Sequence, residues 1–306
     1  MTAKKIEIKL RMFDPRRVTP NKNCIFIGKK QTGKSTLLAN ILYHNRKIPF
    51  GIAMSGTEDG NKFYQSYIPD TFIYSEFVEE VVEKLIRRQK KCVSQGIPNS
   101  ESFLLLDDLM FDSKSFVNKK CIRQIFMNGR HWKLLLLLTS QYVMSLPPDL
   151  RSQIDFIFVF KENIQRNRRR LWENFFGVFP TYDEFEKALF ECTENYECLV
   201  LDNACTSNKI EDQVFWYKAP FPTPKFRVGS KELWNYHNKT YNKHYDDDSD
   251  IERGDSVFTK NTKPIIHICK TKKKKRVNVD TSKKEIGKTL KTRDKEEKVK
   301  KKTLNR

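Results

Sequence analysis

Residues 28–35 place the strictest limit on how this chain can fold. They read Gly-Lys-Lys-Gln-Thr-Gly-Lys-Ser and match the pattern G-x-x-x-x-G-K-[ST]. The two glycines let the backbone wrap closely around phosphate oxygens, and successive N–H groups point into the loop. Such a loop needs a buried strand before it and the N-terminus of a helix after it. The apolar residues 24–27 and the helix-forming residues 35–43 meet both requirements.

This loop predicts a nucleoside triphosphate as the ligand. The Lys34 ammonium is expected to reach the β and γ phosphates, and the Ser35 hydroxyl is expected to ligate a bridging Mg²⁺. The predicted nucleotide-binding residues are Gly28, Lys29, Lys30, Gln31, Thr32, Gly33, Lys34, Ser35 and Thr36.

A second motif lies at residues 103–108, which read Phe-Leu-Leu-Leu-Asp-Asp. A buried strand that ends in an acidic residue, a Walker B strand, places a carboxylate beside the Mg²⁺. We expect Asp107 to be this metal-side acid and Asp108 to act as a general base on the attacking water. Alone, the run could be a core strand that enters a turn. Downstream of a phosphate-binding loop, it favours hydrolytic ATPases over simple kinases or GTPases.

The sequence favours ATP over GTP. Guanine specificity usually comes from an Asn-Lys-x-Asp loop, and the nearest string, residues 118–121, reads Asn-Lys-Lys-Cys and lacks the aspartate. An Asp-x-x-Gly string does not follow the Walker B strand either.

Three further polar residues are candidates for catalysis. Gln141 follows a run of five leucines at 134–138, and a polar residue at the tip of a strand beside Walker B can contact the γ-phosphate. Arg130 and Arg151 precede two of the predicted strands, and either could stabilise transition-state charge, supplied by a neighbouring subunit. The alternatives are a strand-terminating turn for Gln141 and solvated surface side chains for the two arginines.

The remaining apolar segments predict an α/β fold. Short, largely apolar segments at 24–27, 52–54, 103–106, 133–139 and 154–160 predict strands and alternate with helical stretches. This alternation predicts a mostly parallel sheet with helices on both faces. We expect a domain at residues 1–218, with its motifs within 21–160.

The C-terminal third differs in composition. Residues 219–259 are predicted to be a linker that is first proline-rich and then acidic. Residues 260–306 hold 19 Lys and Arg against 5 Asp and Glu, so most of the formal net charge of +20 lies there. Like-charged blocks with few apolar residues do not fold alone, so we expect a disordered basic tail. The tail could bind nucleic-acid phosphates, direct nuclear localisation through residues 272–276, or only improve solubility.

Neither a zinc site nor a membrane span is expected. The seven cysteines include no C-x-x-C pair. The N-terminus lacks the apolar core of a secretory signal. The longest purely apolar run, residues 134–138, is far shorter than the roughly 20 residues that cross a bilayer. These features predict an intracellular protein.

In their order, the motifs resemble those of the viral genome-packaging ATPases of the FtsK/HerA superfamily, above all the poxvirus-type packaging ATPase of large nucleocytoplasmic DNA viruses. The resemblance lies in residues 25–36, 104–108, 128–131, 138–141 and 146–160. It implies a RecA-like P-loop NTPase core with an additional strand between the two Walker strands, and Gln141 as the sensor glutamine. Position 108 departs from the pattern, because FtsK and HerA proteins often carry Glu where this chain has the shorter Asp108.

The resemblance also implies a function. It predicts an ATP-hydrolysing motor that moves double-stranded DNA into a capsid as a ring of five or six subunits. A capsid or portal-vertex protein is the implied docking partner, and the host cytoplasm or viral factory is the implied location, with association with the virion. Two alternatives stay open: a small-molecule (nucleoside) kinase, and a scaffold that binds ATP as a switch.

Overall fold

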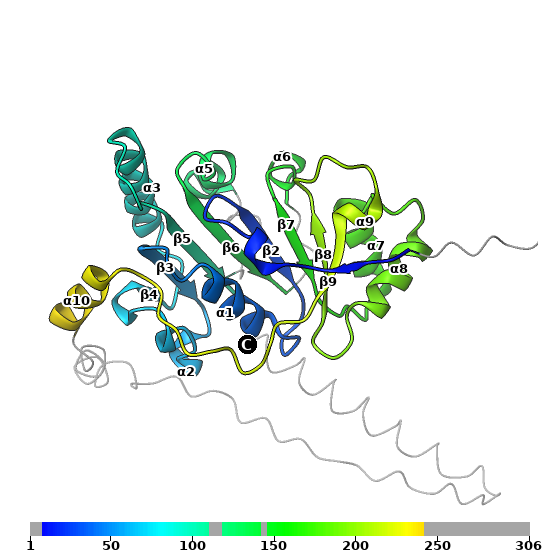
Figure 1. Cartoon of the computed structure of the whole chain (residues 1–306), viewed down its shortest axis with the longest axis horizontal. Helices are drawn as coiled ribbons and strands as arrows, with labels where there is room; N and C mark the ends of the chain where they lie inside the picture. Colours follow the sequence, from blue (N-terminus) through cyan, green and yellow to red (C-terminus); the bar gives the residue numbers. More distant parts are fainter. Residues whose placement is uncertain (1–7, 110–117, 142–145, 242–306) are drawn as a thin grey trace, which may run out of the picture. The chain divides into compact units, whose positions relative to one another are not determined.

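The computed structural model describes residues 8–109, 118–141 and 146–241. The acidic linker and the lysine-rich tail predicted beyond residue 241 lie outside these described residues. The described chain forms an α/β domain in which helices cover both faces of one sheet (Figure 1).

Parallel pairing dominates the sheet. Its strand order is β1-β9-β8-β7-β2-β6-β5-β3-β4. Neighbouring strands are parallel except where β8 pairs with β7 and with β9, so β8 is the one reversed strand among those described. The predicted mostly parallel sheet is therefore confirmed. The strands are β1 Arg11–Met12, β2 Asn23–Ile27, β3 Phe50–Ser55, β4 Ile73–Tyr74, β5 Ser102–Asp107, β6 Leu134–Ser140, β7 Phe156–Val159, β8 Cys198–Asp202 and β9 Val214–Tyr217.

An additional strand separates the two Walker strands. β6 lies between β2, which leads into the phosphate-binding loop, and β5, which ends in the acidic motif. The register pairs Leu136 of β6 with Asn23 on one side and with Leu104 on the other. This order is the one that the resemblance implies. It brings the carboxyl ends of β2, β6 and β5 to the same edge of the sheet.

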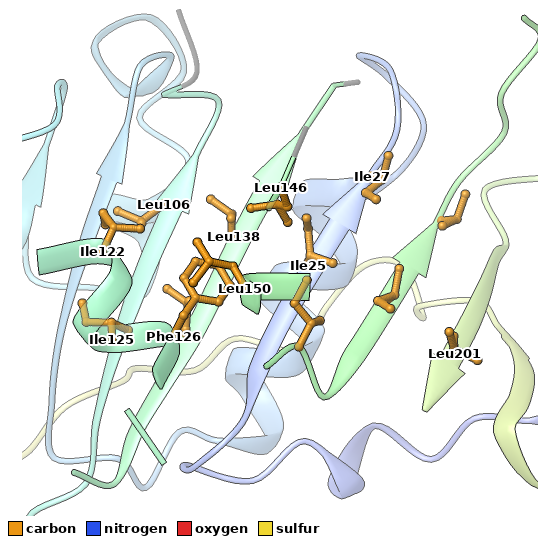
Figure 2. Packing of buried hydrophobic residues seen from close by; sticks show 14 of the residues in the cluster. Ile25, Ile27, Leu106, Ile122, Ile125, Phe126, Leu138, Leu146, Leu150 and Leu201 are labelled. Carbon is orange, nitrogen blue, oxygen red and sulfur yellow. The ribbon is translucent and has the colours of Figure 1, made fainter. Parts of the chain in front are cut away.

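The helices cover the two faces because strand side chains alternate in direction. Leu104 and Leu106 belong to a core cluster with α3 and α5, whereas Phe103 and Leu105 pack in a second cluster with α1. Figure 2 shows part of the first cluster, including Ile25, Leu138, Ile122, Phe126 and Leu150. Within the described ranges, none of the helices has the length and apolar character needed to cross a bilayer. The helices are α1 Lys34–His44, α2 Glu58–Asn61, α3 Glu79–Ser94, α5 Lys120–Asn128, α6 Pro148–Arg151, α7 Gln165–Asn174, α8 Tyr182–Glu191, α9 Ile210–Gln213 and α10 Lys231–Thr240, and the 3-10 turns are η1 Pro15–Arg17, η2 Tyr64–Ser66 and η3 Asp70–Phe72.

The folded domain continues past residue 218, where we expect a linker to begin. Val228 is buried, and its N–H donates a hydrogen bond to the carbonyl oxygen of Tyr67 at 2.9 Å. α10 follows, capped by the Ser230 side chain, which accepts from the N–H of Leu233. The prolines interrupt regular structure, but apolar side chains beyond them return to the core. The described domain therefore reaches at least residue 241.

Candidate nucleotide-binding site

The loop predicted to hold phosphates connects β2 to α1, as its sequence requires. The Gly28 N–H donates to the carbonyl oxygen of Ser140 at 3.0 Å, which ties the start of the loop to the end of β6. A Cβ at Gly28 would lie 2.7 Å from the Cβ of Phe160. Gly33 has φ +99°, a left-handed backbone that side chains rarely adopt. Gly28 is thus required by its close contact with the Phe160 side chain, and Gly33 by its backbone conformation.

Lys34 lies in the first turn of α1 and holds the loop from within. Its Nζ donates to the carbonyl oxygens of Gly28 at 2.6 Å and of Lys29 at 2.7 Å. Burial lowers the pKa of Lys34, while the nearby carboxylates of Asp107 and Asp108 act in the opposite direction. A phosphate that enters the loop would compete for an ammonium group that is already oriented toward the loop interior.

Asp107, the last residue of β5, is buried, and each of its carboxylate oxygens accepts a hydrogen bond. Its Oδ1 accepts a hydrogen bond from the Thr139 hydroxyl at 2.6 Å, and its Oδ2 accepts one from the Tyr64 hydroxyl at 2.7 Å. Burial, with the Asp107 carboxylate as the next cause, raises the pKa of Tyr64 well above its usual value. The tyrosine therefore keeps the proton that it donates, and the carboxylate is held in one orientation.

Asp108 has the left-handed backbone value φ +53°, which is uncommon for a residue other than glycine. Its N–H donates to the Thr139 hydroxyl at 3.0 Å, and its Oδ1 accepts from Nε2 of Gln141 at 2.5 Å. Asp107, Thr139, Asp108 and Gln141 therefore form one continuous chain of hydrogen bonds across the ends of β5 and β6. Residues held in rare backbone conformations cluster at functional sites.

These side chains meet at one cavity of about 760 Å³. Six of the nine predicted loop residues line it, and the other three hold the loop: Gly28 through its backbone, Thr32 through a bond to the Lys29 carbonyl, and Lys29 through an ion pair with Glu162. The cavity is lined by Lys30, Gln31, Gly33, Lys34, Ser35, Thr36, Thr57, Asp107, Asp108, Gln141, Tyr196, Lys218, Ala219 and Phe221.

Arg130 and Arg151 lie at the amino ends of the parallel strands, at the edge of the sheet opposite to the phosphate-binding loop. Arg130 precedes β6 and forms an ion pair with the buried Asp155 at 2.8 Å. Arg151 precedes β7 and donates a hydrogen bond to Asn174. The seven residues of β6 separate Arg130 from the cavity by roughly 20 Å at the usual rise per residue. Neither arginine can reach a phosphate bound in the loop of its own subunit.

Sequence reasoning missed Tyr64, Tyr196, Lys218 and Phe221. Tyr64 lies 43 positions before Asp107, in a short turn without hydrophobic periodicity, so only the tertiary structure shows their contact. Tyr196 lies just before the start of β8, and Lys218 and Phe221 follow the end of β9. Their place in the sequence could have indicated them, because loops at the carboxyl ends of the strands in a parallel sheet commonly line its ligand site.

Removing the Tyr64 hydroxyl is expected to destabilise the domain. Tyr64→Phe leaves Oδ2 of the buried Asp107 without its donor, at a cost of about 1–3 kcal/mol in unfolding free energy. Tyr67→Phe is the matched control, because among the described residues the buried Tyr67 hydroxyl has no hydrogen-bond partner. Urea denaturation of both variants measures the difference. Equal losses in the two variants would show that the Tyr64–Asp107 bond contributes nothing specific.

Comparison with known proteins shows where the chain belongs. No family model matches it. Over 247 residues it is 35% identical to protein L437 of Acanthamoeba polyphaga mimivirus, covering 78% of this chain and 86% of that protein. Over 252 residues it is 37% identical to protein 088R of Invertebrate iridescent virus 3, covering 78% of this chain and 96% of that protein.

Among solved structures, the chain is similar to the genome packaging NTPase B204 of Sulfolobus turreted icosahedral virus 2 in complex with AMP. The TM-score is 0.48 and the identity 20%, over 66% of this chain and 99% of that chain. The identity to the mimivirus and iridescent-virus proteins confirms the viral relationship that the sequence motifs predict. The chain belongs to a family of proteins that large DNA viruses encode, with members in mimivirus and in the invertebrate iridescent viruses.

Proposed function

We propose that the chain binds ATP with Mg²⁺ and hydrolyses the bond between its β and γ phosphates. The observation that carries this proposal is the hydrogen-bonded chain from Asp107 to Gln141, which shares one cavity with Lys34 and Ser35. A loop that only bound phosphates would not need two acids and an amide held together in the cavity beside it.

The residues present fit a magnesium ion. Mg²⁺ prefers oxygen ligands and binds through one or two protein groups together with substrate phosphates. The Ser35 hydroxyl and the Asp107 carboxylate line the same cavity and would hold it. When bound, the ion neutralises phosphate charge.

The side chains of this subunit then divide the remaining work. Lys34 binds the β and γ phosphates. Asp108 accepts a proton from water as the water oxygen forms a bond to the γ-phosphorus, and the bond between that phosphorus and the β–γ bridging oxygen breaks to release ADP. Gln141, bonded to Asp108, orients this carboxylate and the water. This hydrogen bond fixes the orientation of the aspartate, which is shorter than the glutamate common at this position.

An arginine for the transition state would come from a neighbouring subunit. Arg130 is half exposed at the edge of the sheet away from its own cavity, so the next subunit in a ring could approach it there, although contact with that subunit's cavity requires Arg130 to leave its ion pair with Asp155. Arg151 lies at the same edge and is the second candidate. In a closed ring of five or six subunits the interfaces are head-to-tail, so the proposal requires this edge of each subunit to face the site of the next.

We extend the proposal to a motor that packages viral double-stranded DNA into the capsid. Three observations support this proposal: the chain belongs to a protein family that large DNA viruses encode, its motifs follow the order of the packaging ATPases, and its formal net charge is +20. A capsid or portal-vertex protein is the proposed docking partner. The proposed location is the host cytoplasm or viral factory, with association with the virion.

Long double-stranded DNA is expected to raise ATP turnover severalfold at low salt. Because Lys and Arg would bind phosphates by releasing counterions, the stimulation should fall steeply as salt increases. Phosphate release from the full chain, measured with and without DNA across a salt series, tests this. Absence of stimulation at every salt concentration, together with phosphorylation of an added nucleoside, would favour the kinase alternative.

A further inference from the structure

Two aromatic side chains beside the phosphate-binding loop are unusually exposed. Phe221 is 84% exposed and Tyr196 70% exposed, the two highest values among the exposed large apolar side chains of the described chain. Both line the cavity that contains Lys34 and Ser35. Among the described residues, neither ring packs against another aromatic ring or under a cation. Large apolar surface exposed at a concave polar site marks a place where a ligand binds.

The topology brings both rings to the edge of the sheet that carries the loop. Because β8 is reversed, Tyr196, two residues before it, lies at the carboxyl edge of β7 and β2. Phe221 follows the end of β9, which runs in the same direction as β2, so it lies at the same edge. β8 and β9 are on the side of β2 opposite to β6 and β5 (Figure 1). The rings therefore flank the loop on the side away from Asp107 and Asp108.

The position of Tyr196 is fixed by its backbone. Asn195 and Tyr196 both have left-handed φ values, +50° and +67°, in a turn closed by a hydrogen bond from the N–H of Glu197 to the carbonyl oxygen of Glu194 at 2.8 Å. A Cβ at Gly33 would lie 3.4 Å from the Cβ of Tyr196. The turn thus packs directly on the loop and holds the Cβ of Tyr196 beside Gly33.

We propose that Tyr196 and Phe221 form the subsite for the purine base of the nucleoside triphosphate. This inference rests on the proposed nucleotide site. With the γ-phosphate at Asp108 and Gln141 and the other phosphates along the loop, the nucleoside extends toward β8 and β9. There the two rings offer faces on which a base stacks. A base that covers them removes from water the apolar surface that is otherwise exposed.

Comparing ATP with inorganic tripolyphosphate tests this subsite, because tripolyphosphate has the phosphates and lacks the base. Tyr196→Ala and Phe221→Ala are each expected to weaken binding of Mg-ATP to the full chain by about 5- to 150-fold, the range typical of one base–aromatic stack. Binding of Mg-tripolyphosphate should stay within about twofold of the unchanged protein, since uncharged rings add little to phosphate affinity. Tyr196→Phe, which keeps the ring, should restore ATP binding. Isothermal titration calorimetry measures all of these constants.

Two controls separate the possible results. Tyr236→Ala removes another exposed aromatic ring, away from the cavity, and should leave both affinities unchanged. Equal losses of ATP and tripolyphosphate in Tyr196→Ala would show that the turn only supports the loop, and unchanged ATP binding would show that the rings serve a different contact; either result overturns the subsite. Lys34→Ala tests the phosphate site itself. If that variant binds both ligands normally, the proposed function fails independently of the base subsite.

Discussion

Replacing Lys34 with alanine is expected to lower ATP turnover by at least about 100-fold, the loss typical of removing one preorganised group that stabilises transition-state charge. ATP binding should weaken as well, because the ammonium group contacts phosphates in both the ground state and the transition state. The variant also leaves the carbonyl oxygens of Gly28 and Lys29 without the donor that they share. Phosphate release at saturating ATP and calorimetric titration of ATP measure the two effects.

Lys47→Ala is the matched control for this change. Lys47 is exposed just beyond the end of α1, outside the cavity lining, so its loss removes the same charge without touching the loop. The control should retain full turnover. Turnover within about tenfold of the unchanged protein in Lys34→Ala, a far smaller loss than one such group typically causes, would contradict hydrolysis at this site.

Asp108→Asn is expected to separate binding from chemistry. The general base contributes about 10²- to 10⁴-fold to such reactions, so turnover should fall by that factor. ATP affinity should change little. The amide is isosteric with the carboxylate, and its oxygen can still accept the bond from Gln141. Single-turnover hydrolysis and equilibrium binding of ATP, measured on the same preparation, give the two quantities.

Asp183→Asn serves as the control for charge, because Asp183 is exposed in the first turn of α8 and lies outside the cavity. It should hydrolyse ATP at the normal rate. If Asp108→Asn does so too, the base is another group. If it loses ATP binding instead, Asp108 holds the nucleotide and does not activate water.

The centre of the fold could be predicted because its determinants are local. The runs at 24–27, 103–106 and 134–138 are continuous and apolar, as strands buried on both faces must be, and β2, β5 and β6 lie where they predict. The glycine spacing requires a tight loop between a strand and a helix. The viral family is confirmed for the same reason, since it was inferred from these contiguous motifs.

The rest depends on contacts between distant segments. The contact of Tyr64 with Asp107 exists only once η2 packs beneath β5. The return of Val228 and α10 to the domain was hidden by the prolines that precede them, which indicate a break in regular structure but not the end of a domain. The residue type of Asp108 allows its left-handed backbone but does not predict it, and the Thr139 hydroxyl that accepts from its N–H lies on a different strand.

The ion pair of Arg130 bears on whether this side chain could reach the phosphate-binding site of a neighbouring subunit. Asp155 is 1% exposed, and a buried carboxylate stripped of its only partner would be costly. Asp155 has two other partners, however: the ammonium of Lys22 at 3.1 Å and the N–H of Asn23 at 2.9 Å. Arg130 can therefore swing outward while its counter-charge stays compensated. Lys22 and Asn23 thus reduce the cost of releasing Arg130 from this ion pair, and the proposed contact with the phosphate of a neighbouring subunit requires that release.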